Sequence, residues 1–454
     1  MKTSRKAKTA FFCSQCGAEH PKWQGQCREC AAWNSLIEEK ARSGKVTRRS
    51  STSIDPQALT RISHDSTKGY VSGVGELDRV LGGQLLPGMT VLIGGEPGIG
   101  KSTLLLQAAD AYSRQGLSVL YVTGEESLSQ LKRRAERLGV DGERVAAVNA
   151  TNLEEIVSLL GKSHYAVVLI DSIQTVSSDS FDSPPGTVAQ VREAANQLVT
   201  LAKATGFALI LVGHVTKEGM VAGPKVLEHI VDTVIYFEGD SSQLYRVLRV
   251  TKNRYRAANE MGLFQMNSSG LTEVTNPSSF FLSDDNRTSR VGSVVAGVCE
   301  GHRPLMIDVQ ALVTTAAYGN PQRVAGGIDN KKLSLLLAVL EKRCDYPMAT
   351  NDVFVSVAGG LRLSEPALDL PLLVAIVSSL MNRPVDGQTL VVGEVGLSGE
   401  VRAIAEINRL ASEAAKLGFR TMVLPEANLE HVTEKSIELI GVKDIQTALD
   451  KVIG

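Results

Sequence analysis

Apolar and polar positions along residues 67–275 follow the pattern of buried strands separated by amphipathic helices. Short apolar runs bounded by turn residues predict strands at residues 90–94, 118–122, 167–171, 208–212 and 231–237. Apolar residues recur at helical spacing over residues 102–115, 127–138, 153–160 and 188–205. Continuously apolar strands that alternate with helices are typical of a parallel sheet covered on both faces. The sequence therefore predicts an α/β core in this region.

The remaining chain divides by composition. Residues 1–38 are cysteine-rich, residues 39–66 are polar and predict a linker, and residues 276–290 predict a second junction. Strands at residues 243–251 and 262–266 are expected to extend the core as an antiparallel edge. A second α/β domain is predicted over residues 291–454. Its expected helices lie at residues 332–341 and 366–381, and its expected strands at residues 294–298, 305–313, 353–357, 389–392 and 421–424.

Composition narrows the class of protein. The 454 residues suggest two or three domains, and with 43% hydrophobic but only 5% aromatic residues their cores must be aliphatic. The net charge of −1 excludes a globally basic coat for nucleic acid, although residues 1–50 carry eleven Lys or Arg against four Asp or Glu. No apolar run is long enough for a membrane span or a signal peptide. We therefore expect a cytoplasmic protein with no membrane partner.

Four of the six cysteines form two C-x-x-C pairs separated by ten residues, at Cys13, Cys16, Cys27 and Cys30. Two such turns place four sulfur atoms at the corners of a tetrahedron, which suits zinc. Iron–sulfur clusters use other spacings, and six cysteines are too few for a disulfide scaffold. We expect one structural zinc per chain. Trp23 and Trp33 are expected to pack around this metal turn, with stacking on nucleic-acid bases as the alternative.

A phosphate-binding loop follows the first predicted strand of the core. The segment matches G-x-x-x-x-G-K-[ST] and consists of Gly95, Glu96, Pro97, Gly98, Ile99, Gly100, Lys101 and Ser102, with Thr103 next. Glycines let backbone N–H groups wrap around phosphates, and the following helix adds the positive end of its dipole. Lys101 is predicted to reach the β and γ phosphates, and Ser102 to ligate magnesium. No guanine signature is evident, so the expected nucleotide is ATP.

Acidic residues end two other predicted strands. Asp171 closes the apolar run at residues 166–170, where a second magnesium contact is expected in a P-loop enzyme. Glu125 and Glu126 follow the strand after the P-loop helix, where a carboxylate polarises the attacking water or, alternatively, caps the next helix. In RecA-like ATPases a glutamate in this position is the catalytic base. We favour Glu125 over Glu126 for that role.

These motifs, together with VLIDSIQT and VGHVTKEGMVAGPKVLEH, closely resemble the RadA (Sms) family of bacterial DNA repair proteins over essentially the whole chain. The resemblance implies a zinc ribbon, a RecA-like core and a C-terminal domain. It also implies a DNA-dependent ATPase of recombinational repair that uses ATP and Mg²⁺. Members of the family act as homo-hexameric rings similar to the helicase DnaB. They act on single-stranded and branched DNA, and extend heteroduplex from joints made by the RecA recombinase.

The family's K-N-R-F-G motif is altered in this chain. The segment reads Lys252, Asn253, Arg254, Tyr255 and Arg256. Tyr255 keeps an aromatic ring, but Arg256 replaces a glycine and is strained if that position needs a positive φ, or adds a phosphate contact. Alternate residues of a strand share one face, so Lys252 and Arg254 are expected to reach together into a neighbouring subunit's active site. The alternative is a solvated basic strand end.

Two loops of the core are candidates for DNA contact by the same resemblance. One follows Asp171 and contains Pro184, Pro185 and Gly186; the other carries Lys217 and Lys225. Small residues with sparse lysines suit a loop that approaches a single-stranded backbone, and mobile surface loops are the alternative. His214 ends the strand before the second loop, where RecA-like proteins hold a polar sensor of the γ-phosphate. It is either a coupling residue or a satisfied core histidine.

Residues 351–380 and 391–428 resemble the proteolytic domain of Lon. An active Lon has a serine in a P-S-A-G segment and a later lysine that accepts its proton. Here the first segment is Pro366-Ala367-Leu368-Asp369, and Asn408 stands near the place of the lysine. Ser364 is displaced by about two residues, so we expect no peptidase activity and a role in assembly and DNA binding. An ATP-dependent protease and a KaiC-like signalling ATPase are the rival functions.

Overall fold

The computed structural model describes residues 9–13, 18–40, 68–214, 224–239, 245–258, 260–276, 278, 281–282, 288–316, 321–358 and 365–453. The chain forms two compact units. One comprises Met1–Gly239 and Leu244–Glu273, and the other comprises Asp240–Gln243 and Val274–Gly454. Each unit is described separately. Among the residues described, no helix is long and apolar enough to cross a membrane.

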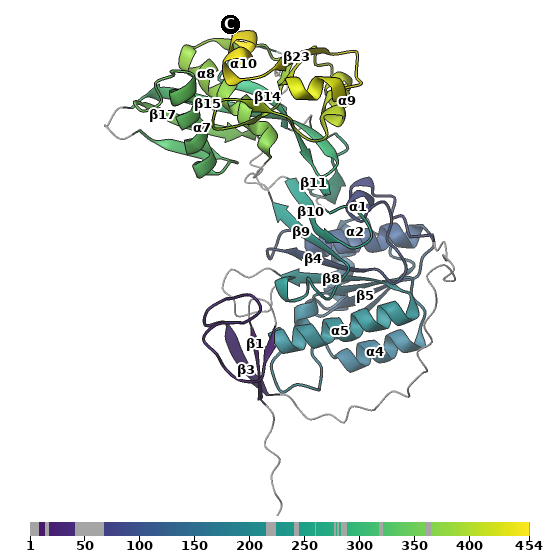
Figure 1. Cartoon of the computed structure of the whole chain (residues 1–454). Helices are drawn as coiled ribbons and strands as arrows, with labels where there is room; N and C mark the ends of the chain where they lie inside the picture. The colour runs from purple at the N-terminus through teal and green to yellow at the C-terminus, as the bar shows by residue number, and fades with distance from the viewer. Residues whose placement is uncertain are drawn as a thin grey trace, which may run out of the picture. The chain divides into compact units, whose positions relative to one another are not determined.

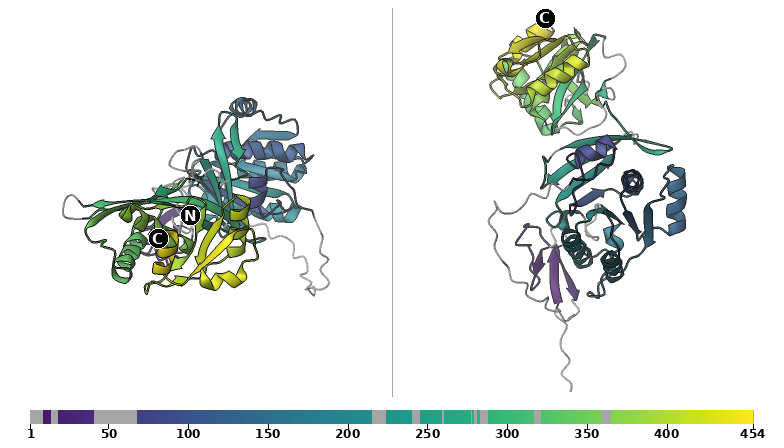
Figure 2. Two further views of the ribbon diagram at one scale, coloured as in Figure 1. Left: turned by 90° about the horizontal axis from the view of Figure 1, so that it is seen from above. Right: turned by 90° about the vertical axis from the view of Figure 1, so that its right-hand side faces the viewer.

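The first unit begins with a small antiparallel ribbon, purple in Figures 1 and 2. Its strands have the order β2-β1-β3 and are β1 (Thr9–Cys13), β2 (Glu19–His20) and β3 (Leu36–Lys40). The buried cluster of this ribbon consists of Cys13, Cys27 and Leu36. Such a core is too small to hold a fold by itself, so a bound metal has to contribute folding free energy.

A nine-stranded sheet follows, with the order β12-β11-β10-β9-β4-β8-β7-β5-β6. Its parallel strands are β4 (Thr90–Gly95), β5 (Val119–Thr123), β6 (Val145–Asn149), β7 (Val167–Asp171), β8 (Ala208–His214) and β9 (Thr233–Gly239). The antiparallel edge consists of β10 (Tyr245–Asn253), β11 (Met261–Asn267) and β12 (Gly270–Glu273). The predicted parallel core with an antiparallel edge is therefore confirmed.

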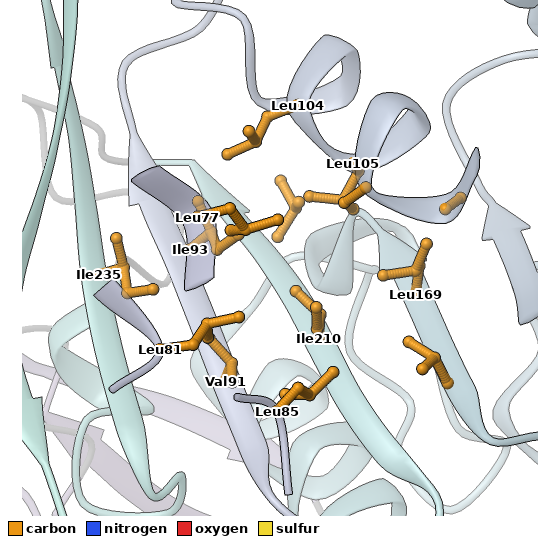
Figure 3. Close-up of a cluster of buried hydrophobic side chains, with 14 of the residues drawn as sticks. Leu77, Leu81, Leu85, Val91, Ile93, Leu104, Leu105, Leu169, Ile210 and Ile235 are labelled. Carbon is orange, nitrogen blue, oxygen red and sulfur yellow. The ribbon is translucent and has the colours of Figure 1, made fainter. Parts of the chain in front are cut away.

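Helices cover both faces of this sheet, because alternate strand residues point to opposite sides. On one face, Leu77, Ile93, Leu105, Leu169 and Ile210 belong to a single buried cluster (Figure 3). That cluster joins the strands to α1 (Gly75–Val80), α2 (Lys101–Arg114) and α3 (Leu128–Arg137). On the other face, the intervening strand residues pack against α4 (Leu153–Lys162) and α5 (Val188–Thr205) (Figure 1). Short 3₁₀ turns follow β7 and precede β9, at Ile173–Thr175 and Pro224–Val226.

The second unit is built around a seven-stranded sheet with the order β16-β17-β15-β14-β19-β22-β23. Its strands are β14 (Ser293–Glu300), β15 (Arg303–Thr315), β16 (Arg323–Gly326), β17 (Asn351–Val357), β19 (Thr389–Val391), β22 (Thr421–Pro425) and β23 (Glu438–Val442). Two short pairs flank it: β13 (Arg290–Val291) with β18 (Pro384–Val385), and β20 (Glu394–Val395) with β21 (Val401–Arg402).

The helices of this unit are α7 (Asn330–Arg343), α8 (Asp369–Met381), α9 (Ile407–Lys416) and α10 (Ile445–Val452). Short 3₁₀ segments lie at Pro366–Leu368 and Glu426–His431. Helix α8 is buried over most of its length and packs on β14 and β15. A helix that is apolar on all sides belongs in the centre of a domain. The chain thus has the predicted α/β class in both of its larger parts.

Candidate functional site

The carboxyl ends of four neighbouring parallel strands lie side by side at one end of the nine-stranded sheet, called its carboxyl end below. Gly95 of β4 is paired with His214 of β8, and Thr123 of β5 is paired with Asp171 of β7. Ligands of open α/β sheets bind at this end, because the loops after the strands converge there. The register therefore brings the P-loop, both predicted acidic segments and His214 to one place.

The P-loop wraps between β4 and α2 with glycines where the backbone requires them. Gly98 has φ of 79° and Gly100 has φ of 116°, both in the left-handed region that side chains avoid. Gly95 is equally constrained, since a Cβ on it would come within 2.6 Å of the Phe237 carbonyl oxygen. Helix α2 begins at Lys101, so the N–H groups of its first turn, which includes Ser102 and Thr103, face the loop.

The Lys101 side chain is buried and folded back onto this loop. Its Nζ donates to the carbonyl oxygens of Gly95 at 2.8 Å and Glu96 at 2.9 Å. Burial lowers the pKa of Lys101 to about 8, against the opposing effect of the Asp171 and Glu125 carboxylates. An amine held in this way is ready to exchange two carbonyl oxygens for phosphate oxygens.

Asp171 ends β7 and is buried, with one carboxylate oxygen engaged. Tyr121 donates its hydroxyl to Oδ2 at 2.7 Å. Burial, with the Asp171 charge as a second cause, raises the pKa of Tyr121 well above its usual value, so the phenol stays a donor. The Oδ1 atom is buried and has no hydrogen-bond partner among the described residues. An orphaned buried carboxylate oxygen beside a P-loop fits a divalent cation or its water.

Glu125 and Glu126 are separated by their surroundings. Glu125 accepts a hydrogen bond from Ser172 Oγ at 2.5 Å and lies 2.7 Å from His214 Nε2. The His214 hydrogen bond is the largest cause that lowers the pKa of Glu125 to about 2, with Ser172 and Lys101 adding to it. Glu126 instead forms an ion pair with Arg134 on α3. Only Glu125 therefore faces the Lys101 and Asp171 side.

His214 connects this end to the following loop. Its Nδ1 is buried and lacks a hydrogen-bond partner in the part of the chain that the structure describes. The loop's Lys217 falls outside the described residues, whereas Lys225 is exposed on the 3₁₀ turn Pro224–Val226. In the other predicted DNA loop, Gly186 has φ of 81°, which glycine alone adopts readily. The structure thus joins His214 to Glu125 by a direct contact.

Lys252 and Arg254 lie at the amino end of the same sheet, where the parallel strands β4 and β9 begin. Lys252 is paired with Val234, at the start of β9, and the Arg254 N–H donates to the Asp232 carbonyl oxygen at 3.1 Å. Asp232 in turn bonds Thr90 at the start of β4. The P-loop begins five residues after Thr90, roughly 16 Å away at about 3.3 Å per strand residue. The pair therefore cannot reach its own phosphate site.

The Lys252 and Arg254 side chains reach the same short segment, residues 228–232. The register shifts between Val250 and Lys252, and β10 ends before Arg254. Lys252 Nζ donates to the carbonyl oxygens of Glu228 and Val231, the latter at 2.8 Å, and burial lowers its pKa. The two alternate residues therefore lie on one side, as expected, although Arg254 is one residue beyond the end of β10.

A buried carboxylate that the sequence does not reveal organises this pair. Asp232 is 2% exposed, and its Oδ1 lies 3.4 Å from Arg254 Nη1 and 3.1 Å from Lys203 Nζ of α5. Its Oδ2 accepts from the Thr90 hydroxyl at 2.7 Å. The hydrogen bonds from Thr90 and Lys203 lower the pKa of Asp232 although burial opposes them. Asp232 and Lys203 are distant in sequence from Lys252 and Arg254, so no local motif could have shown that the four residues converge.

The rest of the altered motif forms a turn. Asn253 Oδ1 accepts from the N–H groups of Tyr255 at 2.9 Å and Arg256 at 3.1 Å. Arg256 lies outside the left-handed region, so the strain considered for this position is absent. Its side chain passes so close to Gly82 that a Cβ there would meet Arg256 Cγ at 2.3 Å. Tyr255 is 46% exposed. Arg256 therefore packs along its own subunit.

Three of the four predicted metal ligands gather in the ribbon. The Sγ atoms of Cys13, Cys27 and Cys30 lie within 4.8 Å of one another, and those of Cys13 and Cys30 are 3.6 Å apart. Tetrahedral zinc with bonds of about 2.3 Å sets its sulfur atoms about 3.8 Å apart, so the donor set fits zinc. Cys16 falls outside the described residues. His20 Nε2 is 3.4 Å from Cys27 Sγ, and the Gln24 amide is 2.9 Å from His20 Nδ1.

The two tryptophans depart from expectation. Trp23 is 56% exposed and Trp33 is 72% exposed, so neither packs into the centre of the metal turn. The buried residues of the ribbon include Cys13, Cys27 and Leu36 together with His20, whereas both indoles lie outside this cluster. The prediction that both rings pack around the metal is therefore wrong.

The second unit carries neither half of a serine–lysine pair at the predicted positions. Ala367 is buried in the 3₁₀ turn before α8, and Asn408 Oδ1 accepts from the Thr433 N–H at 2.7 Å. A lysine does reach this region, but Lys332 Nζ is held by Asp369 at 2.6 Å. Ser364 falls outside the described residues. The positions of the predicted pair that the structure describes therefore carry neither a serine nucleophile nor a lysine base.

Comparison with known proteins gives three matches to family models. The model "Rubredoxin metal binding domain" matches residues 11–38, "AAA domain" matches residues 59–220, and "Subunit ChlI of Mg-chelatase" matches residues 306–428. The crystal structure of the RadB recombinase is similar with a TM-score of 0.37 and 22% identity, over 45% of this chain and 99% of that one.

Curated relatives match over the whole length. The DNA repair protein RadA of Halalkalibacterium halodurans is 47% identical over 99% of this chain and 99% of its own. The protein of the same name from Escherichia coli strain K12 is 45% identical over 97% of this chain and 98% of its own. Identity at this level across the metal ribbon, the ATPase core and the C-terminal unit shows a common family. The chain belongs to the RadA family of bacterial DNA repair proteins.

Proposed function

We propose that this chain is a DNA-dependent ATPase that drives branch migration in recombinational repair as a hexameric ring. The family and the RecA-like core support ATP hydrolysis and DNA repair as its general role. The observation that carries the proposal is the position of Lys252 and Arg254 at the amino end of the sheet, whereas their own P-loop lies at its carboxyl end. A phosphate-binding pair in that position acts only if another copy brings its nucleotide there.

We assign the hydrolysis step to residues at the carboxyl end of the sheet. Lys101 neutralises the β and γ phosphates, and Ser102 with Asp171 holds Mg²⁺, which supplies further charge neutralisation when bound. Glu125, which stays ionised because its pKa is about 2, orients the attacking water and accepts its proton. A base of such low pKa abstracts a proton poorly, so release from His214, the largest cause of the low pKa, has to precede catalysis.

His214 therefore couples the site to DNA in this proposal. It follows Gly213 at the end of β8, directly before the segment that holds Lys217, and it contacts Glu125 at 2.7 Å. Movement of that loop on DNA would withdraw the imidazole and raise the basicity of Glu125. DNA stimulation then arises from one broken hydrogen bond, and Lys217 and Lys225 are the proposed phosphate contacts of the loop.

The trans contact is assigned to Lys252 and Arg254, with Asp232 and Lys203 as positioning residues. Arg254 is 49% exposed, and its single contact with the Asp232 carboxylate is long at 3.4 Å. Lys203 holds the same oxygen at 3.1 Å, so Asp232 remains paired when Arg254 leaves. This arrangement lets the guanidinium move to a neighbouring γ-phosphate without stranding a buried charge.

The second unit is proposed to serve assembly and DNA binding, not proteolysis. Ala367 lacks a hydroxyl, and the Asn408 side chain is occupied by Thr433. Casein turnover that depends on Ser364 would restore the protease alternative. DNA-independent hydrolysis without any effect on strand exchange would instead favour a KaiC-like signalling ATPase.

The test of the whole proposal measures ATP hydrolysis with and without single-stranded DNA, alongside electron microscopy of the same sample. Stimulation by DNA together with six-membered rings is the expected result. Hydrolysis by monodisperse single chains at the full rate would contradict it, because Lys252 and Arg254 would then have no phosphate to act on.

A further inference from the structure

Trp23 and Trp33 are the only two tryptophans in the 454-residue chain, and both lie exposed on the metal ribbon. Single exposed apolar residues are common on proteins and need no explanation. Two exposed indoles in a ribbon of about thirty residues are different, because tryptophan is the side chain that gains most from burial and is concentrated at binding surfaces. Their exposure, at 56% and 72%, calls for a ligand.

The turn that holds these rings is fixed by backbone contacts. Gln26 and Trp33 form an isolated bridge, and the Asn34 N–H donates to the Gly25 carbonyl oxygen at 2.7 Å. The Trp33 ring lies against Gly25, where a Cβ would stand 3.6 Å from ring atom Cζ3. Since Gly25 is two residues from Trp23, both indoles belong to the turn around Cys27 and Cys30. Metal binding at those cysteines thus orders the surface on which the rings stand.

We propose that Trp23 and Trp33 form a stacking surface for the bases of single-stranded nucleic acid. Every base offers a π-face, so two ordered indoles bind single strands without regard to sequence. The surface includes the exposed cations Lys22 and Arg28, next to Trp23 and Cys27 in the chain, against the one acidic residue Glu29 between residues 21 and 34. Cations beside an aromatic ring are the usual means of holding the phosphates that link stacked bases.

Charge complementarity extends to both sides of the ribbon. Residues 1–8 contain four Lys or Arg, residues 41–49 contain four more, and neither segment has an acidic residue. Thr9 and Lys40 are paired across β1 and β3 at the end of the sheet opposite Cys13, Leu36 and the metal turn. The two basic segments thus adjoin the ribbon in sequence at the end away from the indoles, and their eight cations favour a polyanion over a neutral or acidic partner for the ribbon as a whole.

A protein partner fits this surface less well. Hot spots between proteins are usually surrounded by contacts that exclude water. Trp23 is flanked in sequence by Lys22 and Gln24, and Trp33 is followed by Asn34, so the surroundings of the rings are polar. Stacking needs only an accessible ring face, and both indoles are more than half exposed. We therefore assign the surface to nucleic acid.

The inference rests on the proposed function only in that both involve DNA. It places a DNA contact outside the ATPase core, on a part of the chain that does not hydrolyse nucleotide. The Lys101→Ala variant separates the two, because it removes hydrolysis and leaves the ribbon unchanged. A response of the ribbon to DNA in that variant therefore does not depend on a working motor.

Intrinsic tryptophan fluorescence of the full-length, zinc-loaded protein reports this surface alone, since no other tryptophan is present. Titration with a short poly-dT oligonucleotide is expected to quench the emission, in wild type and in Lys101→Ala alike. Trp23→Phe and Trp33→Phe each isolate the signal of the other ring. Unchanged emission at saturating oligonucleotide, with DNA-stimulated hydrolysis intact, overturns this inference and leaves the motor proposal standing.

Affinity provides the second readout, from the anisotropy of a labelled oligonucleotide. Trp33→Ala is expected to weaken binding by about 5-fold to 100-fold, the range that loss of one stacking ring gives, whereas Trp33→Phe keeps most of the affinity. Equal zinc content in both variants verifies that the ribbon is folded. Wild-type affinity in the Ala variant contradicts the inference. Emission that shifts with the recombinase protein but not with the oligonucleotide also overturns it and identifies a protein interface.

Discussion

The two ends of the nine-stranded sheet differ in net charge. At the carboxyl end, the charged residues around the phosphate-binding loop are the cations Lys101, Arg134 and Arg246 and the carboxylates Glu96, Glu125, Glu126 and Asp171, which is three cations against four carboxylates. At the amino end, Lys203, Lys252 and Arg254 surround Asp232 and Glu228, giving three cations against two carboxylates. These charges sum to −1 (3 − 4) at the carboxyl end and to +1 (3 − 2) at the amino end.

The difference fits the head-to-tail assembly that we propose. A chain cannot bring the opposite ends of its own sheet together, but two copies can, and repetition of that contact closes a ring if the rotation allows. Opposite net charges at the two ends favour the correct pairing over contacts of like ends. The contrast between the ends supports the proposed ring more directly than any single motif does.

The largest expected effect comes from removing the lysine of the phosphate-binding loop. Lys101→Ala should abolish hydrolysis and weaken ATP binding, because the β and γ phosphates lose the amine that the P-loop carbonyl oxygens hold in place. Steady-state hydrolysis and nucleotide binding by calorimetry check this result. Turnover at the wild-type rate would mean that phosphate is bound elsewhere.

Removal of a cation at the amino end should affect only turnover. Arg254→Ala is expected to lower kcat by roughly 10³ to 10⁵, the range for an arginine finger, with ATP binding to single chains little changed. Arg256→Ala is the matched control, because that neighbouring arginine packs on Gly82 of its own subunit. Equal losses in both variants would indicate a general effect of the turn and not a specific finger.

Substitution of Glu125 should lower kcat far more than substitution of its neighbour Glu126. Glu125→Gln is expected to reduce kcat by about 10² to 10⁴, as for loss of a general base. Glu126→Gln breaks the ion pair with Arg134 and should change kcat much less. Single-turnover hydrolysis with matched zinc content measures both. A greater loss in Glu126→Gln would reverse the assignment.

A smaller effect follows from the lowered pKa of Lys101. Its pKa is about 8 in the protein and 10.5 ordinarily, so the nucleotide-free amine loses its proton as pH rises through 8. Phosphate restores the charge, and ATP binding must then take up a proton between about pH 8 and 10.5, weakening at most tenfold per pH unit. Calorimetry in buffers of different ionisation enthalpy detects this uptake. Lys101→Arg, which stays charged, should show none.

Sequence patterns predict those parts of the molecule whose determinants are contiguous. The P-loop, Asp171 and the cysteine pairs are local motifs, and the strands that carry the site are continuously apolar. Strand β6 is not predicted from the sequence because it is a half-exposed edge strand, and α1 is not predicted because it has only six residues. A pattern that is neither fully apolar nor long enough for a helical period gives no clear signal.

Tertiary contacts decide what the sequence leaves open. The sequence does not distinguish Glu125 from Glu126. In the structure Glu126 forms an ion pair with Arg134 of α3, and this leaves Glu125 as the candidate base. Asp232 and Lys203 come from the start of β9 and from α5, and nothing local connects them to Arg254. The tryptophans appear as core residues in a cysteine-rich segment, but the small ribbon fills its interior without them.

The central claim is that the two ends of the sheet meet between copies, and mixing two inactive variants tests it directly. Lys101→Ala chains retain the amino end, and Arg254→Ala chains retain the carboxyl end. In mixed rings, interfaces that join an Arg254→Ala carboxyl end to a Lys101→Ala amino end are complete. Recovery of hydrolysis on mixing, with hexamers verified by mass, is the predicted result. No recovery in verified mixed hexamers would contradict the account and leave Arg254 acting within its own subunit or on DNA.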